Sequence, residues 1–270
     1  MSVFVIIVVA VVVILIVRGV LRNVAEKNEE KSRAYYNSAK EHERNGNYEQ
    51  AITDFNKFFE LNKDPYYTNY MERGNLCNVT ANFDLAITDY TRVINLGKKS
   101  VKIQENAYGA DASTGSDLCN IAKAYDLRGD VYDKKGDRKQ AVENYSEAVF
   151  YFDKTIEAAP YGAEYYAMRG DVYEKLGHDD KKLENYNQAI WTCDRFLQQD
   201  RNSFSQLYLR GKYYENLGDI EHTISDFEAI MQFQLDKDGF EDFEDYNYAV
   251  KSLSDLQKKV IKELDAIKNS

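Results

Sequence analysis

A fivefold repeat of small and aromatic residues constrains this sequence more than any other feature. Four glycines follow an Arg, and Ala39 takes the same place in an earlier copy: Gly74, Gly129, Gly170 and Gly211. An aromatic residue follows each small residue after sixteen positions: Phe55, Tyr90, Tyr145, Tyr186 and Phe227. A small residue lets two helices approach closely, and an aromatic residue on the second helix fills the space beside it. The pattern therefore predicts five helical hairpins.

Turn residues stand seven positions after each small residue: Gly46, Ala81, Gly136, Gly177 and Gly218. We expect the residue after each turn to cap the second helix. These residues are Asn47, Asn82, Asp137, His178 and Asp219. The small residues advance by 35, 55, 41 and 41 positions. We interpret the two spacings of 41 as longer second helices, and the small, polar stretch at 106–116 as a loop.

The spacing of small residue, turn and aromatic residue resembles the tetratricopeptide repeat. Aligned on that family, the units begin near Ser32, Tyr67, Ala122, Ala163 and Phe204. The resemblance implies an all-α, right-handed α-solenoid of about five hairpins over 32–236, with an insertion at about 99–121. Because solenoids need a cap at an open end, we expect a C-terminal capping helix within 237–270.

An apolar run at the start of the chain predicts one transmembrane helix before the solenoid. Val3 to Val17 are all apolar, and residues 1–22 are just long enough to span a bilayer. No Lys or Arg precedes the run, whereas Arg18 and Arg22 follow it, which argues against a cleavable signal peptide and places the body in the cytoplasm. The alternatives are a buried core helix and a body on the outer or periplasmic face. Residues 23–31 are expected to form a linker.

Composition and motifs disfavour nucleic-acid binding and catalysis. The net charge of −10 repels phosphate backbones. The three cysteines include no CxxC pair, and the sequence has no motif typical of a catalytic or phosphate-binding site. We therefore expect a protein that is not an enzyme and has no metal and no cofactor. The oligomeric state is left open.

The family resemblance implies a concave groove, lined by the first helix of each hairpin, that holds a protein or peptide partner. The residues that match its lining positions are Tyr36, Lys40, Asn75, Asp126, Asp130, Asp133, Glu164, Asp171, Glu174, Tyr208 and Lys212. The acidic middle of this set would suit a basic or mixed-charge segment, and the alternative is an ordinary solvated surface. The hypothesis is a membrane-anchored scaffold; the alternative is a permanently packed subunit of a larger membrane assembly.

A recurrent Arg is expected to pair across each hairpin, because it stands sixteen residues before an Asp or Asn. The expected pairs are Arg73 with Asp89, Arg128 with Asn144, Arg169 with Asn185, and Arg210 with Asp226. Two would be salt bridges and two charge-assisted hydrogen bonds. The alternative is that each Arg lays its aliphatic stem over the seam between the helices.

Overall fold

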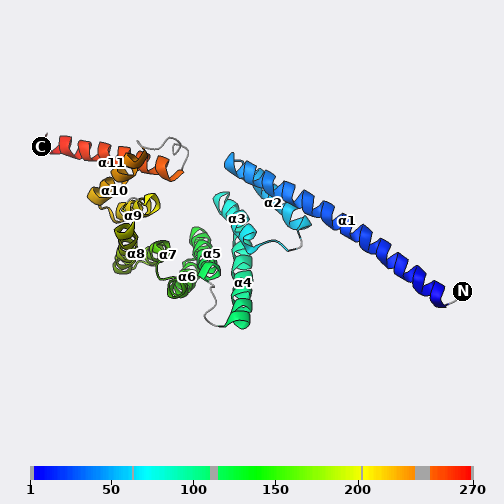
Figure 1. The fold of residues 1–270 in the computed structure, drawn as a ribbon. Coiled ribbons are helices and arrows are strands. Elements are labelled where there is room, and N and C mark those ends of the chain that lie inside the picture. The colour runs from blue at the N-terminus through cyan, green and yellow to red at the C-terminus, as the bar shows by residue number, and fades with distance from the viewer. Residues whose placement is uncertain (1–2, 63, 110–114, 202, 235–243, 269–270) are drawn as a thin grey trace. The chain divides into compact units, whose positions relative to one another are not determined.

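Helices make up all the regular structure of the described residues. The computed structural model describes residues 3–62, 64–109, 115–201, 203–234 and 244–268, without the side chains of 3–13, 233–234, 260–261 and 263–268. The helices are α1 (Val3–Arg44), α2 (Tyr48–Leu61), α3 (Tyr67–Val79), α4 (Phe83–Tyr108), α5 (Gly115–Lys134), α6 (Arg138–Ala158), α7 (Ala163–Lys175), α8 (Asp179–Gln199), α9 (Phe204–Leu217), α10 (Ile220–Gln234) and α11 (Glu244–Lys268) (Figure 1). Unit 1 comprises Met1–Gly97 and Asp130–Asp137, and unit 2 comprises Lys98–Gly129 and Arg138–Ser270.

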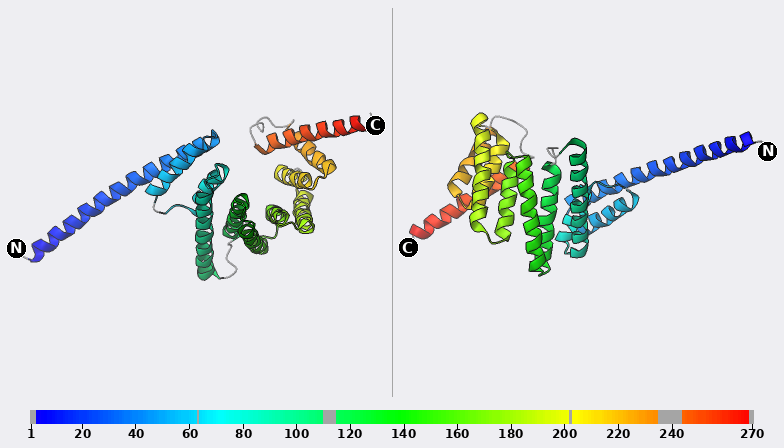
Figure 2. Two further views of the ribbon diagram at one scale, coloured as in Figure 1. Left: turned by 180° about the vertical axis from the view of Figure 1, so that it is seen from behind. Right: turned by 90° about the horizontal axis from the view of Figure 1, so that it is seen from below.

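The first hairpin of unit 1 pairs the C-terminal part of α1 with α2. Ala39, Ala51 and Phe55 are fully buried where the two helices meet. Beyond this hairpin α1 continues toward its N-terminus without α2 beside it (Figure 2). Residues 23–31, which were predicted to link the anchor to the solenoid, are helical. The Ala, Glu and Lys residues of this segment are strong helix formers.

The membrane helix predicted over 1–22 falls mainly on residues whose side chains are not described. Among the described residues, no helix is long and apolar enough to cross a bilayer. Residues 1–13 carry most of the apolar run, and their side chains lie outside the described part of the chain.

The second hairpin of unit 1 shows why its small residue is a glycine. A Cβ atom on Gly74 would lie 2.9 Å from Cε1 of the fully buried Tyr90. The turn of this hairpin holds Ala81 at a φ of 59°, in the left-handed region, where the other four turns have glycine. Left-handed backbone is unfavourable for a residue with a Cβ atom, so this turn carries local strain.

Unit 2 holds the hairpin of α7 with α8 and the hairpin of α9 with α10, which lie side by side in both views of Figure 2. It also holds α6 and the part of α5 up to Gly129. A Cβ atom would lie 2.6 Å from Tyr145 at Gly129, and 2.5 Å from Phe227 at Gly211. The second helices α6 and α8 have 21 residues each, against 14 in α2, so the extra residues lengthen them as predicted.

The segment between the second and third hairpins is more helical than predicted. Helix α4 has 26 residues and reaches Tyr108, and α5 already begins at Gly115. Much of the insertion at 99–121 therefore extends these two helices. The predicted loop at 106–116 is wrong at both of its ends, while 110–114 lie outside the described residues.

Capping of the second helices follows the prediction at Asp219. Its Oδ1 accepts the backbone N–H of His222 at 3.2 Å. Asn47 and His178 make no side-chain cap hydrogen bond, so the prediction is wrong there. Their ψ angles of 63° and 69° lie well below the extended values typical of a cap residue, which aim the side chain at the first free N–H groups.

Helix α11 packs on the last hairpin of unit 2. Ala249 and Leu253 are buried against an apolar cluster from α8, α9 and α10 that comprises Leu197, Leu207, Tyr208, Phe227 and Ile230. The contact covers apolar surface that α9 and α10 would otherwise expose. Of the predicted capping segment at 237–270, residues 237–243 lie outside the described part of the chain.

Candidate functional site

The recurrent Arg residues pair with the expected Asp or Asn in all four hairpins that carry them. Arg73 and Arg210 each make a bidentate salt bridge. Nε and Nη2 of Arg73 lie 2.8 and 2.7 Å from the carboxylate oxygens of Asp89, and those of Arg210 lie 2.9 and 2.6 Å from the oxygens of Asp226. Both carboxylates are buried. These pairs join the first helix of each hairpin to its second helix.

The two amide pairs use one hydrogen bond from the Arg and a second from the amide itself. Nε of Arg128 donates to Oδ1 of Asn144 at 2.7 Å, and Nε of Arg169 donates to Oδ1 of Asn185 at 2.7 Å. The amide nitrogens of the two Asn residues donate to the backbone carbonyl four residues earlier, at 2.7 and 2.8 Å. A carboxylate at these positions would have no proton to donate to that carbonyl.

Each of three Arg residues also contacts the second helix of the preceding hairpin, a partner that the sequence reasoning missed. Arg73 Nη1 donates to Asn56 Oδ1 at 2.7 Å, and Arg210 Nη1 donates to Asp194 at 2.5 Å. Arg169 Nη1 makes the equivalent ion pair with Asp153. These partners stand sixteen or seventeen residues before the Arg, so the guanidinium joins successive hairpins.

The first hairpin has Ser38 where the other hairpins have Arg. Asp54, in the slot of the paired carboxylates, accepts a hydrogen bond from Ser38 Oγ at 2.6 Å and lies 3.1 Å from Nδ1 of His42. In a hydrolytic triad the serine hydroxyl would bond to the histidine and not to the carboxylate. This trio is therefore arranged as a structural hydrogen-bond cluster.

The predicted acidic groove residues of α5 and α7 in unit 2 are largely paired within the chain. Lys175 Nζ lies 2.7 Å from Asp126, and Lys182 Nζ lies 2.6 Å from Glu174. Asp171 accepts a hydrogen bond from the Tyr186 hydroxyl, and burial raises the pKa of its carboxyl. Two of these carboxylates are thus already ion-paired within the chain, and the third is hydrogen-bonded and partly buried.

The remaining acidic residues of the predicted groove are Glu164, Asp130 and Asp133. Glu164 is exposed at the start of α7. Asp130 and Asp133 lie on the part of α5 that belongs to unit 1, and both interact with other groups of the chain.

Helix α11 packs against the predicted groove residues of α9. Tyr208 is buried, and its ring meets that of Tyr248 edge to face at a centroid distance of 5.9 Å. Nζ of Lys212 lies 5.4 and 5.0 Å from the centroids of the same two rings. The prediction that Tyr208 and Lys212 line an open groove is therefore wrong, because α11 packs on them.

The groove residues of unit 1 converge on a carboxylate of α3. The Tyr36 hydroxyl donates to Glu72 Oε1 at 3.1 Å, and Lys40 Nζ lies 3.2 Å from the same oxygen and 2.5 Å from Glu43. Burial and the Glu72 carboxylate raise the pKa of Tyr36. Asn75, farther along α3, accepts a hydrogen bond from the Tyr90 hydroxyl at 2.9 Å. The network around Glu72 ties α1 to α3.

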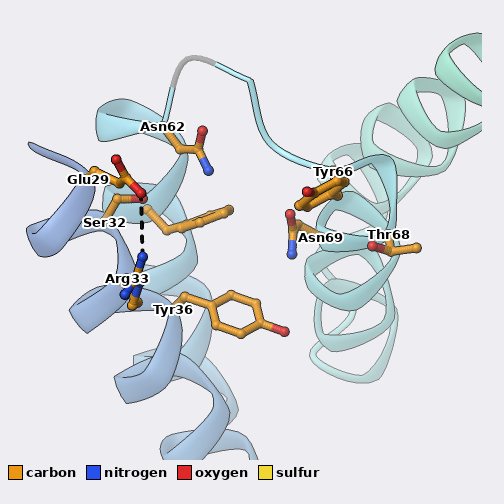
Figure 3. A pocket seen from close by; sticks show the side chains of 9 residues that line it. Glu29, Ser32, Arg33, Tyr36, Asn62, Tyr66, Thr68 and Asn69 are labelled. Atoms are coloured by element: carbon orange, nitrogen blue, oxygen red, sulfur yellow. Dashed lines mark hydrogen bonds and ion pairs between the residues drawn. The ribbon is translucent and has the colours of Figure 1, made fainter. Parts of the chain in front are cut away.

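Beside this network lies a pocket of about 550 Å³ between α1 and the start of α3, with the end of α2 behind it (Figure 3). Its lining residues are Glu29, Ser32, Arg33, Tyr36, Phe58, Asn62, Tyr66, Thr68 and Asn69. Tyr36 of this set was predicted as a groove residue, and Arg33 stands at the first lining position of the first unit. Ser32 directly precedes that position, and Tyr66 directly precedes the second unit, so neither was predicted.

One polar atom of the pocket has no partner. Ser32 Oγ is buried, and no group of the described structure forms a hydrogen bond with it. The whole residue is only 3% exposed. An unsatisfied buried hydroxyl is unfavourable, because the hydrogen bonds that it made to water in the unfolded chain are not replaced.

The described cysteines and acidic residues are not placed for metal binding or thiol chemistry. The described residues hold no group of three or more His, Cys, Asp or Glu side chains that is placed to bind a metal ion. All three cysteines are buried, and burial raises the pKa of both Cys77 and Cys193 to about 12. Thiols in this state are poor nucleophiles at neutral pH.

Comparisons with known proteins give the following matches. The tetratricopeptide repeat model matches residues 32–65, 122–149 and 163–190, which belong to the first, third and fourth hairpins. The thermophilic TPR protein TTC0263 of Thermus thermophilus is 15% identical, with 82% of this chain and 98% of that chain covered and a TM-score of 0.47. The MamA protein is 16% identical over 79% of this chain and 97% of that chain, with a TM-score of 0.37. YrrB, a TPR protein with an unusual peptide-binding site, is 17% identical, with 80% of this chain and 92% of that chain covered and a TM-score of 0.37. No curated protein matches the sequence.

Proposed function

We propose that this chain, which carries tetratricopeptide repeats, is a non-catalytic scaffold that holds a segment of a partner protein on the first helices of its hairpins. Its five hairpins would stack as a right-handed solenoid. The observation that carries the proposal is the pocket between α1 and α3, which remains open although the groove residues around it are paired. An extended repeat surface can bind a partner protein without a catalytic group or a cofactor.

On this proposal, the carboxylates of α5 and α7 contribute little to the choice of the partner segment. The carboxylates of Asp126 and Glu174 already face lysines of the chain, and that of Asp171 faces a tyrosine hydroxyl. A basic peptide would have to displace these internal partners. The unit 1 pocket, which has a neutral balance of side chains, is therefore the better candidate for the contact.

Residues 1–22 would hold the scaffold at a membrane, with the body in the cytoplasm. The support for this part of the proposal is the apolar run from Val3 to Val17 and the position of Arg18 and Arg22 after it. Protease added to intact cells should leave the body uncut, and washing with carbonate should leave the chain in the membrane fraction. Digestion from outside would reverse the orientation, and release by carbonate would reject the anchor.

A second candidate function is a permanently packed subunit of a membrane assembly. It is favoured by exposed apolar residues at matching positions of α6 and α8. Val142 and Leu183 stand thirteen residues after the glycine of their hairpins, and Phe150 and Trp191 stand twenty-one after it. Trp191 and Phe150 are 48% and 49% exposed. Aromatic residues of this kind are enriched in protein interfaces.

Site-specific photo-crosslinking separates the two functions. The photoreactive aromatic residue p-benzoylphenylalanine would replace Tyr66 at the pocket, or Trp191 on α8 as the matched control, in the full chain in its native membrane. The scaffold proposal expects a partner protein crosslinked from position 66. Crosslinks from position 191 alone would reject it and favour the assembly subunit.

A further inference from the structure

We propose that the exposed face of α8 in unit 2 binds the same face of a second copy of the chain, with the two α8 helices antiparallel across a twofold axis. The inference goes beyond the proposed function and does not depend on it. Three properties of the face lead to it: an exposed apolar pair, opposite charges at its two ends, and an uncharged middle.

Two large apolar side chains of α8 remain exposed at the surface of the chain. Leu183 is 50% exposed and Trp191 is 48% exposed. Both line an open hollow of about 770 Å³, whose other lining residues also belong to α8. Trp191 stands eight positions after Leu183. An antiparallel copy centred between them therefore places each Trp191 beside the Leu183 of the other copy, and the contact covers both residues twice.

The two ends of this face carry opposite charges. Asp180 stands at the start of α8, and Arg195 stands about 22 Å farther along the helix. Both are exposed, and neither makes an ion pair within the part of the chain that the structure describes. The Arg195 guanidinium lies 4.9 Å from the centroid of the Trp191 ring. An antiparallel copy brings each Asp180 to the Arg195 of the other copy, which gives two ion pairs for one contact.

The middle of the face is uncharged, as a contact between identical helices requires. Asn187 and Gln188 stand midway between Asp180 and Arg195, and both line the hollow. At a twofold axis a residue meets its own copy, so a charge at this point would repel itself. An amide both donates and accepts hydrogen bonds, and it can therefore bond to an identical amide.

Helix α6 carries the equivalent apolar pair but lacks this self-complementary charge pattern. Lys139 stands where α8 has Asp180, and Glu147 stands where α8 has Gln188. An antiparallel copy of α6 would set Lys139 against Lys154 and would bring Glu147 close to itself. Like charges opposed in this way disfavour the contact. The same comparison identifies α8 as the self-associating helix and makes α6 the control.

The test uses the full chain in broken cells that hold two differently tagged copies, with the membranes and the soluble fraction kept together. Asn187→Cys places a thiol beside the proposed axis. Ser146→Cys places one at the equivalent exposed position of α6, as the matched control. The three native cysteines are buried, so the wild type gives the background. Copper phenanthroline oxidises paired thiols to a disulfide, and non-reducing gels give the rate at which mixed-tag dimers form.

We expect Asn187→Cys to form the mixed-tag dimer, and Ser146→Cys to stay near the background. In the Asn187→Cys chain, Asp180→Arg or Arg195→Asp alone should slow the disulfide about tenfold, because two ion pairs become two repulsive contacts. The two reversals together should restore at least about half of the original rate, since the charges again match. Thermal unfolding of the purified variants would verify that each is folded.

Three results would overturn the inference. Equal rates from positions 146 and 187 would show random collision, and a double reversal as slow as the single ones would show that the face does not pair with itself. A disulfide from position 187 to a different protein would assign the face to a foreign subunit.

The failure of this inference is distinguishable from failure of the proposed function. A partner protein crosslinked from position 66, without a disulfide from position 187, would keep the scaffold and reject the self-association. A disulfide from position 187 that responds to the charge reversals, without any crosslink from position 66, would keep the self-association and reject the scaffold pocket.

Discussion

Removal of the Arg73 guanidinium should destabilise the chain far more than removal of the charge from its partner Asp89. The side chains of this pair are only 12% and 1% exposed. Arg73→Met keeps much of the apolar stem but removes both hydrogen bonds to Asp89 and the bond to Asn56. It leaves a buried carboxylate with no counter-charge. Breaking a buried pair in this way costs about 3–5 kcal/mol.

Two other hairpins of the chain indicate that Asp89→Asn should lower the free energy of unfolding only slightly. The third and fourth hairpins have Asn144 and Asn185 in this position, and each amide donates to the backbone carbonyl four residues earlier. In Asp89→Asn the new amide nitrogen can bond in the same way to the carbonyl of Leu85, while Nε of Arg73 keeps its acceptor. One hydrogen bond to a charged group is exchanged for a neutral one, so we expect a loss of about 1 kcal/mol.

The double variant gives the sharpest result, because the sign of its effect is predicted. Arg73→Met with Asp89→Asn should be more stable than Arg73→Met alone, since the second change removes the uncompensated charge. The measurement is the free energy of unfolding in urea, followed by circular dichroism. If the double variant is less stable than Arg73→Met, the pair is not held by charge compensation and the reasoning is refuted.

The stability of Arg73→Met should also depend on pH. Burial already raises the pKa of Asp89 above its ordinary value, despite the adjacent Arg73, and loss of the guanidinium should raise it further. A carboxyl with a raised pKa in the folded state binds protons more tightly there than in the unfolded chain. Stability is therefore lost as pH rises from the unfolded pKa, about 3.9, through the folded one. The deficit of the variant should be largest at neutral pH and shrink on acidification.

Three further changes test the packing, the turns and the titration. Gly129→Ala should destabilise the chain by about 1–3 kcal/mol in urea unfolding, because its Cβ atom would lie 2.6 Å from the buried Tyr145 ring; an unchanged midpoint would contradict this. Ala81→Gly should stabilise it by about 1 kcal/mol in the same assay, since φ is 59° there; a loss would show that the turn is not strained. The carboxylate of Asp219 raises the pKa of His222, so an NMR titration should place it above 6.5 and Asp219→Asn should lower it; equal values would exclude the contact. The stabilisation from this contact is present below the unfolded pKa of the His and is lost as pH rises through the folded one.

The hairpins were predictable because their determinants are local and recur. The clash that a Cβ atom on Gly129 would make with Tyr145 depends on two residues of one hairpin, and their sixteen-residue spacing recurs. The same holds for Arg73 and Asp89. The contact from Arg73 to Asn56 was missed because it joins two hairpins, and the alignment of positions within one repeat unit says nothing about contacts between units.

The pocket and the length of α1 escaped the prediction for different reasons. Tyr66 lies in the connection between the first two units, so its place across the pocket from α1 depends on how two hairpins pack. The helix through 23–31 was predictable in principle. Arg22 and Glu26 stand four residues apart and form an ion pair at 2.8 Å, which is the spacing that stabilises an exposed helix.

The absence of Arg from the first hairpin follows from the double contact that the other Arg residues make. Each of Arg73, Arg169 and Arg210 joins its own second helix to the second helix of the hairpin before it. A residue at position 38 would find its partner sixteen positions earlier at Arg22, but Arg22 lies on the same continuous helix α1.

Arg73 contacts the second helix of the preceding hairpin through Asn56. Position 38 has no such helix beside it, so an Arg there would have one partner instead of two. Ser38 and the ring of His42 satisfy Asp54 locally in its place. Ser38 therefore stands in the one hairpin that precedes the first of the Arg contacts between successive hairpins. The same hairpin also contributes Ser32 and Tyr36 to the pocket between α1 and α3.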